Sequence, residues 1–127
     1  MRKLFVLLAL LLLGACATTP APLPSTFLIF FNANSAALTP EASSVIEQAV
    51  TAIKQRKPAT VAIGAGAGAG SNLRLAGPRQ AAVRQALQAA GVNPALLAPA
   101  SLPNSGAEVR ENGNQRVEII LGPPAAR

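Results

Sequence analysis

The chain has 127 residues, of which half are apolar, and this favours one small domain with a packed core. Eleven Lys and Arg against five acidic residues give a net charge of +6, but the basic residues are scattered, so nucleic-acid binding is not expected. The chain contains no His or Asp and one Cys, which excludes His-based triads, His metal sites, Asp dyads and internal disulfides.

The N-terminal residues have the pattern of an export signal. Two basic residues precede an apolar run at 4–13, which is too short to cross a bilayer. The stretch LGAC (13–16) resembles a bacterial lipobox, in which the chain is cut before a Cys that becomes lipid-modified. The resemblance implies a lipoprotein signal peptide at 1–15 and lipidation at Cys16. The alternative is an ordinary signal peptide followed by a free thiol.

The segment after this signal is expected to connect an anchor to a domain. Acyl chains on Cys16 would hold the protein stably at a membrane. Ala17 follows the Cys, and by resemblance to Gram-negative lipoproteins this implies anchoring at the outer membrane on its periplasmic side. Residues 16–26 are rich in Pro, Thr and Ala, which predicts an extended tether.

The first half of the domain predicts two strands around a helix. FLIFF (27–31) is a continuous bulky apolar run and predicts a buried strand. Thr39, Pro40 and Glu41 are typical of a helix N-terminus, and apolar residues then recur at helical spacing until Pro58 ends the helix. ATVAI (59–63) predicts a second buried strand.

The second half repeats this alternation. A helix is expected from Pro78 to Ala90, with Gly91 at the position after its C-cap. Residues 96–101 indicate a weak third strand interrupted by Pro, and the polar, turn-rich stretch 103–114 indicates a loop. RVEIIL (116–121) begins with alternating charged and apolar residues and predicts the last strand, before a short tail at 122–127.

This order, βαβα(β)β, predicts an α+β fold. Strands that alternate with helices require crossover connections and a sheet with helices packed on it. With two helices and so short a chain, we expect a two-layer α/β sandwich, in which both helices pack on a small mixed sheet spanning 27–121.

A glycine-rich run, GAGAGAG (64–70), follows the second strand. It lacks the third glycine and the downstream acid of a dinucleotide fingerprint, and no Gly-Lys-Ser/Thr follows it, so nucleotide binding is not expected. A slack linker is also a poor interpretation, because the run joins a strand to a helix that packs on it. We expect an ordered or semi-ordered turn.

Three stretches in the correct order resemble the OmpA-like C-terminal domain. FFNANSAALTPEA (30–42) is similar to its opening F-D-x-x-S-x-x-L-x-P-x-A, and NQRVEI (114–119) to its closing N-R-R-V-E-I. Between them, Asn72-x-x-Leu-x-x-x-Arg79 is similar to its N-x-x-L-S-x-x-R helix motif, and GVNP (91–94) to the turn that follows. Together with the lipobox, this indicates the peptidoglycan-associated lipoprotein branch.

The resemblance implies a protein that binds the cell wall non-covalently through the diaminopimelate of the stem peptide. Arg79 corresponds to the Arg that binds its carboxylate. In the family, an Asp in a glycine-containing loop binds the ammonium of the diaminopimelate. That loop corresponds here to Gly64, Gly66 and Ala67, and Ala67 or a small neighbour stands in place of the Asp. No acid lies between Glu47 and Glu108. Weakened wall binding is therefore expected.

Three further positions are partly retained. Asn32 stands where the family has an Asp, Asn72 matches the Asn at the end of the loop, and Arg116 matches an Arg of the closing strand. Each also has a simpler interpretation. Arg79 could be a solvated residue in the first turn of its helix, Arg116 could face solvent or form a pair across the sheet, and both Asn are common in turns.

Two functions remain open at this point. The first is an outer-membrane lipoprotein that binds peptidoglycan weakly. The alternative is a degenerate OmpA-like lipoprotein that keeps the fold but has a structural or protein-partner role without wall binding. An enzyme is not expected, because the chain has no nucleophile and base pair, and no cofactor or metal is expected.

Overall fold

The computed structural model describes residues 24–66, 71–102 and 115–126. The expected signal peptide, Cys16 and most of the tether lie outside the described residues, as do Ala67 and the loop at 103–114.

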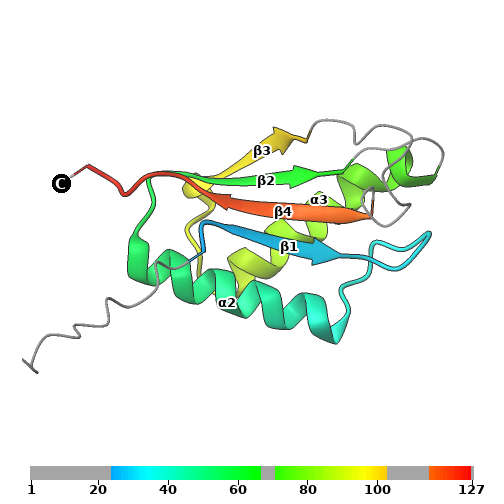
Figure 1. Ribbon diagram of the computed structural model, residues 1–127, viewed down its shortest axis with the longest axis horizontal. Helices are drawn as coiled ribbons and strands as arrows, with labels where there is room; N and C mark the ends of the chain where they lie inside the picture. The colour runs from blue at the N-terminus through cyan, green and yellow to red at the C-terminus, as the bar shows by residue number, and fades with distance from the viewer. Residues whose placement is uncertain (1–23, 67–70, 103–114, 127) are drawn as a thin grey trace, which may run out of the picture.

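Two helices pack on a four-stranded mixed sheet (Figure 1). The elements are β1 (Thr26–Phe30), α2 (Pro40–Arg56), β2 (Val61–Ala65), α3 (Ser71–Ala89), a 3₁₀ turn (Pro94–Leu96), β3 (Leu97–Ser101) and β4 (Arg116–Leu121). The strand order is β1-β4-β2-β3, in which β4 is antiparallel to both neighbours and β2 is parallel to β3. The predicted α+β two-layer sandwich is confirmed.

The N-terminus of α2 forms as the sequence predicted. Thr39 is the N-cap, and its Oγ1 accepts a hydrogen bond of 3.1 Å from the N–H of Ala42. Pro40 occupies the first helical position, where its missing N–H costs nothing. At the other end, Lys57 adopts a left-handed conformation with φ 48° and donates its N–H to the carbonyl of Ile53.

The start of α3 was predicted wrongly. The helix begins at Ser71 and includes Pro78, whereas the sequence placed the start at Pro78. A proline normally marks the first turn, because inside a helix it removes one hydrogen bond. Here the inward side of the helix extends to both sides of the proline, with buried Asn72 before it and buried Val83 and Leu87 after it. Tertiary packing of that side outweighs the local cost of Pro78.

The C-terminus of α3 was predicted correctly. Gly91 has φ +92°, a conformation that glycine adopts without strain. Its N–H donates to the carbonyl of Gln88, and the N–H of Val92 donates to that of Leu87. These two hydrogen bonds form a Schellman motif, which ends the helix and turns the chain toward β3.

The apolar run at 27–31 was predicted to form a buried strand, and only its alternate residues are buried. Phe27 and Ile29 are buried, whereas Leu28 and Phe30 are 45% and 50% exposed. The reason is that the helices cover one face of the sheet, so alternate residues of β1 point to opposite sides. The core lies between the helices and that covered face, where β2 and β4 contribute Val61, Ile63, Val117 and Ile119.

β2 starts two residues later than the predicted strand at 59–63 and continues through the first two residues of the glycine-rich run. The preceding residues pair instead with the C-terminal segment. Ala59 donates its N–H to the carbonyl of Pro123, and Ala125 donates to that of Lys57. The chain after β4 therefore lies alongside the connection between α2 and β2.

Candidate functional site

The candidate site lies where the C-terminal end of β1 meets α3, and Arg79 is at its centre. Arg79 is 0% exposed. Its Nε donates to the carbonyl of Ser35 at 2.8 Å, Nη1 to Oδ1 of Asn72 at 3.0 Å, and Nη2 to the carbonyl of Asn32 at 3.2 Å. The guanidinium thus connects α3 to the turn that follows β1.

The surroundings of this guanidinium are partly aromatic. Its carbon lies 5.5 Å from the centroid of the Phe31 ring, which is the distance of a cation–π contact. Burial lowers the pKa of the Arg79 guanidinium from its ordinary value because water no longer solvates the charge. An arginine nevertheless stays protonated in a protein, so the site keeps a fixed cation.

Arg79 is therefore not a solvated residue in the first turn of its helix, and that interpretation is wrong. Because α3 begins at Ser71, Arg79 lies well inside the helix and its side chain points into the protein. Asn72 is 9% exposed and contacts Arg79 directly. Asn32 belongs to the same cluster through its backbone carbonyl, while the residue itself is exposed.

Two members of this cluster were missed in the sequence. Ser35 contributes a backbone carbonyl, and no side-chain pattern predicts such a contact. Its N–H also donates to the carbonyl of Asn32 at 3.2 Å, and between them Asn34 has φ 54°, so the segment is a tight turn. Phe31 was assigned to the core alone. The one sequence feature that indicated this turn was the stretch NANS (32–35), whose residue types are common in turns.

The remaining candidate residues lie on the β2–β4 pair. Gly66 donates its N–H to the carbonyl of Arg116 at 2.8 Å. Arg116 is partly buried and forms an ion pair of 2.9 Å with Glu118, two residues along its own strand. This ion pair lies within β4, and Arg116 is partly buried and so does not simply face solvent.

Gly64 lies inside β2, opposite Glu118 of β4 and Ala100 of β3. A Cβ at Gly64 would come within 2.7 Å of Cδ2 of Leu102. A larger residue at position 64 would therefore require the Leu102 side chain to move.

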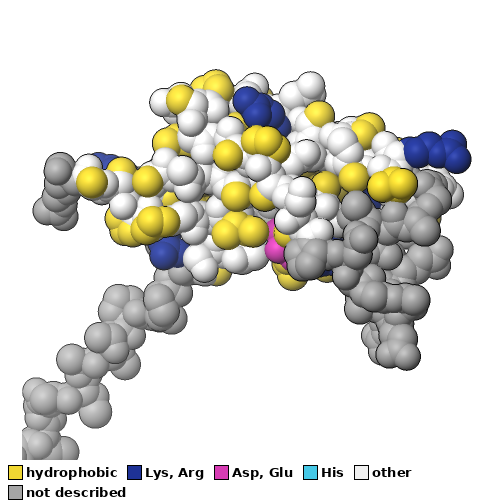
Figure 2. All heavy atoms as spheres, turned by 90° about the horizontal axis from the view of Figure 1, so that it is seen from above, with side chains coloured by type: hydrophobic (Ala, Val, Ile, Leu, Met, Phe, Trp, Pro, Cys, Tyr) yellow, Lys and Arg dark blue, Asp and Glu magenta, His cyan; other side chains and the backbone are white. Residues whose placement is uncertain are grey.

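The described residues offer little for other chemistry. No group of three or more metal-ligating side chains occurs within residues 24–66, 71–102 and 115–126. In the same ranges no helix has the length and apolar character needed to cross a bilayer. On the face shown in Figure 2, the Lys and Arg side chains lie apart from one another, and apolar groups separate them.

Comparison with known proteins supports the fold. No family model matches the chain, and no curated protein matches it either. Among solved structures, the OmpA-like domain of FopA1 from Francisella tularensis is similar, with a TM-score of 0.66 and 22% identity over 78% of this chain and 72% of that one.

Two further structures agree. The peptidoglycan-associated lipoprotein from Burkholderia pseudomallei has a TM-score of 0.61 and 22% identity, covering 74% of this chain and 88% of its own. The C-terminal domain of MotB from Helicobacter pylori has a TM-score of 0.62 and 25% identity, covering 80% of this chain and 87% of its own. The described residues therefore have the OmpA-like fold that the sequence motifs predicted.

Proposed function

We propose that this OmpA-like domain is a non-covalent peptidoglycan-binding module and that Arg79 provides the cation for a stem-peptide carboxylate. The observation that carries the proposal is the position of Arg79 in this fold, where a fixed positive charge lies at the end of the sheet beside Asn72. The peptidoglycan-associated lipoprotein of Burkholderia pseudomallei shares the fold.

Arg79 is 0% exposed, so a ligand carboxylate can reach its guanidinium only if a group packed against it moves. The carbonyls of Asn32 and Ser35 belong to a tight turn, whereas the Asn72 acceptor is a side-chain amide that can rotate. A carboxylate that takes its place on Nη1 forms an ion pair with the guanidinium, which is stronger than the present hydrogen bond from this cation to a neutral amide oxygen. Rotation of the Asn72 side chain would therefore let a ligand carboxylate reach Nη1 of Arg79.

The domain is expected to bind the ammonium of a zwitterionic ligand less well than its carboxylate. The sequence has no acid from 48 to 107, and the resemblance implies Ala67 or a small neighbour at the position of the family's Asp. Loss of a hydrogen bond to a charged group costs about 1.5–3 kcal/mol, so we expect affinity for the wall to be about 10–100-fold below that of a domain with the Asp.

We also propose that the chain is a lipoprotein of the outer membrane. Its parts would be a signal peptide at 1–15, acyl chains on Cys16, a tether, and the domain that begins with β1 at Thr26, so that one molecule links membrane and wall. Labelling cells with radioactive palmitate tests this. The wild-type chain should carry label in the outer-membrane fraction, and Cys16→Ser should carry none.

The alternative function is a degenerate domain that keeps the fold and acts as a structural or partner-binding lipoprotein. The hydrogen bonds of Arg79 favour this alternative, because Ser35, Asn32 and Asn72 give the guanidinium a role in holding α3 against the turn after β1. In neither case does the domain need a cofactor or catalytic chemistry.

Sedimentation of residues 20–127 with purified sacculi separates the two functions. That fragment keeps every described helix and strand. Under the proposed function it pellets with sacculi, Arg79→Ala does not, and Arg74→Ala, which removes the same charge from an exposed position on α3, pellets like the wild type. Circular dichroism confirms that each variant is folded.

Two other outcomes would decide against the proposal. If the wild-type fragment stays in solution and Ala67→Asp makes it pellet, the domain is a degenerate member whose pocket has lost its anion. If pelleting is the same with and without Arg79, the wall contact lies elsewhere and the assignment of Arg79 is wrong.

A further inference from the structure

The two edges of the sheet differ in how well they are protected from pairing with another strand. β1 and β3 are the outer strands of the described sheet. β3 (LAPAS) has Pro99 at its centre, and proline has no N–H to donate. β1 (TFLIF) contains no charged residue, proline or glycine, which are the residues that usually protect an edge.

The backbone of β1 directs hydrogen-bonding groups toward this open edge. The N–H of Phe31 donates to Gln115, and the carbonyl of Ser25 accepts from Leu121, so these two residues face β4. In an antiparallel ladder the direction alternates with each residue. Thr26, Leu28 and Phe30 therefore point their N–H and carbonyl groups away from β4.

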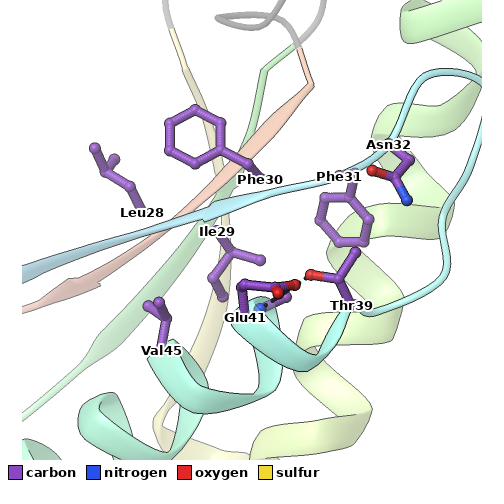
Figure 3. Close-up of a pocket in the computed structure, with 9 residues that line it drawn as sticks. Leu28, Ile29, Phe30, Phe31, Asn32, Thr39, Glu41 and Val45 are labelled. Atoms are coloured by element: carbon purple, nitrogen blue, oxygen red, sulfur yellow. Dashed lines mark hydrogen bonds between the residues drawn. The ribbon is translucent and has the colours of Figure 1, made fainter.

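A groove follows the same edge, between β1 and α2 (Figure 3). One hollow is lined by the consecutive residues 28–32 and by residues of the first turns of α2, including Glu41 and Val45. A second hollow is lined by Pro24 and Phe27 and, from α2, by Gln48, Thr51 and Ala52. Because consecutive residues of β1 line the first hollow, the strand backbone itself is accessible there.

We propose that this edge binds a second copy of the chain, with β1 pairing antiparallel to β1 about a two-fold axis at Leu28. The two copies would then share one continuous eight-stranded sheet, twice the four strands described here. On the open face, Leu28 lies beside Leu28 of the second copy and Phe30 beside its Thr26. Apolar neighbours of this kind stabilise an antiparallel strand pair.

The polar groups of α2 are complementary under the same symmetry. α2 runs opposite to β1, since Thr39 begins it beside the end of β1 and Arg56 reaches back to the carbonyl of Pro24 at 3.2 Å. The two-fold axis therefore brings the hollow with Glu41 against the hollow with Gln48 and Thr51 of the other copy. The Glu41 carboxylate then faces the neutral polar side chains of Gln48 and Thr51.

Sedimentation velocity over a concentration series, with residues 20–127, tests the pairing. We expect a dimer whose dissociation constant rises at least about tenfold in Leu28→Lys, which opposes two ammonium groups at the axis. Leu28→Pro should have the same effect, because it removes an outward N–H and leaves the β1–β4 ladder intact. Leu73→Lys is the matched control, since Leu73 is 62% exposed on α3.

Cross-linking tests the register. The one Cys of the chain, Cys16, is absent from this fragment, so Leu28→Cys introduces a single thiol. Paired residues in an antiparallel ladder have Cα atoms about 5.5 Å apart, a separation that a disulfide can bridge. Mild oxidation should yield a covalent dimer for Leu28→Cys and none for Leu73→Cys. A fragment that is monomeric at every concentration, or a dimer unchanged by both Leu28 variants, would overturn the proposal.

Discussion

Asn72 and Arg79, seven residues apart on α3, are joined by a buried hydrogen bond of 3.0 Å from Nη1 to Oδ1. The same guanidinium also holds the carbonyls of Asn32 and Ser35. The Arg79 side chain, in the third turn of α3, therefore links the first turn of that helix to the turn after β1. The site and the fold depend on the same contacts, so variants of these residues must be measured for both stability and binding.

Arg79→Ala should destabilise the domain. It leaves three buried or partly buried acceptors without this donor and removes the cation beside Phe31. We expect a loss of about 2–4 kcal/mol in the free energy of unfolding. Urea denaturation of residues 20–127 measures it, and Arg74→Ala at an exposed position should stay within about 0.5 kcal/mol of the wild type. Equal stability of the two variants would contradict the role of Arg79 in holding α3 against the turn after β1.

Asn72→Asp should affect stability and binding in opposite directions. The substitution keeps the shape of the side chain but places a carboxylate on Nη1 of Arg79, so the hydrogen bond from the cation to a neutral amide becomes an ion pair. We expect the domain to gain about 1 kcal/mol of stability and to pellet less with sacculi, because the guanidinium is then neutralised from within. Stronger pelleting by this variant would show that a ligand carboxylate does not replace the Asn72 oxygen.

Thr39→Ala separates stability from binding. The variant removes the hydrogen bond to the N–H of Ala42 that caps α2. Loss of an N-cap costs about 1 kcal/mol, so the midpoint of thermal unfolding should fall by several degrees. Pelleting with sacculi below that temperature should not change, since the Thr39 hydroxyl bonds within α2, to the N–H of Ala42. Thr39→Ser, which keeps the hydroxyl, is the control and should restore most of the loss.

Local signals predicted the parts of this fold that local chemistry decides. Thr39 and Pro40 start α2, Gly91 ends α3, and the alternation at 116–121 gives β4. The start of α3 was not predictable in this way, because Pro78 is a strong local signal that packing on both sides of it overrides.

The candidate site was predicted only in part, for a similar reason. Arg79 and Asn72 were identified through motif spacing, and the structure joins them. Their burial and the contribution of Ser35 depend on a turn more than 40 residues earlier in the chain, at a separation of 44 from Arg79. Ser35 acts through a backbone carbonyl, which has no residue-specific signature. The exposure of Leu28 and Phe30 could not be predicted from the sequence, because both faces of β1 carry bulky apolar side chains.

Gly64 offers a test of whether a glycine of the predicted binding loop is required by packing. A Cβ at this position would meet Leu102 at 2.7 Å, so Gly64→Ala forces that side chain to move. We expect a cost of about 1 kcal/mol in the free energy of unfolding, as for other overpacked sites. In a Leu102→Ala background the same substitution should cost nothing, because the obstructing methyl groups are gone. A double-mutant cycle measured by urea denaturation gives the coupling between the two positions. If Gly64→Ala cost the same in both backgrounds, the glycine would be required by the backbone of β2, and Leu102 would be irrelevant to it.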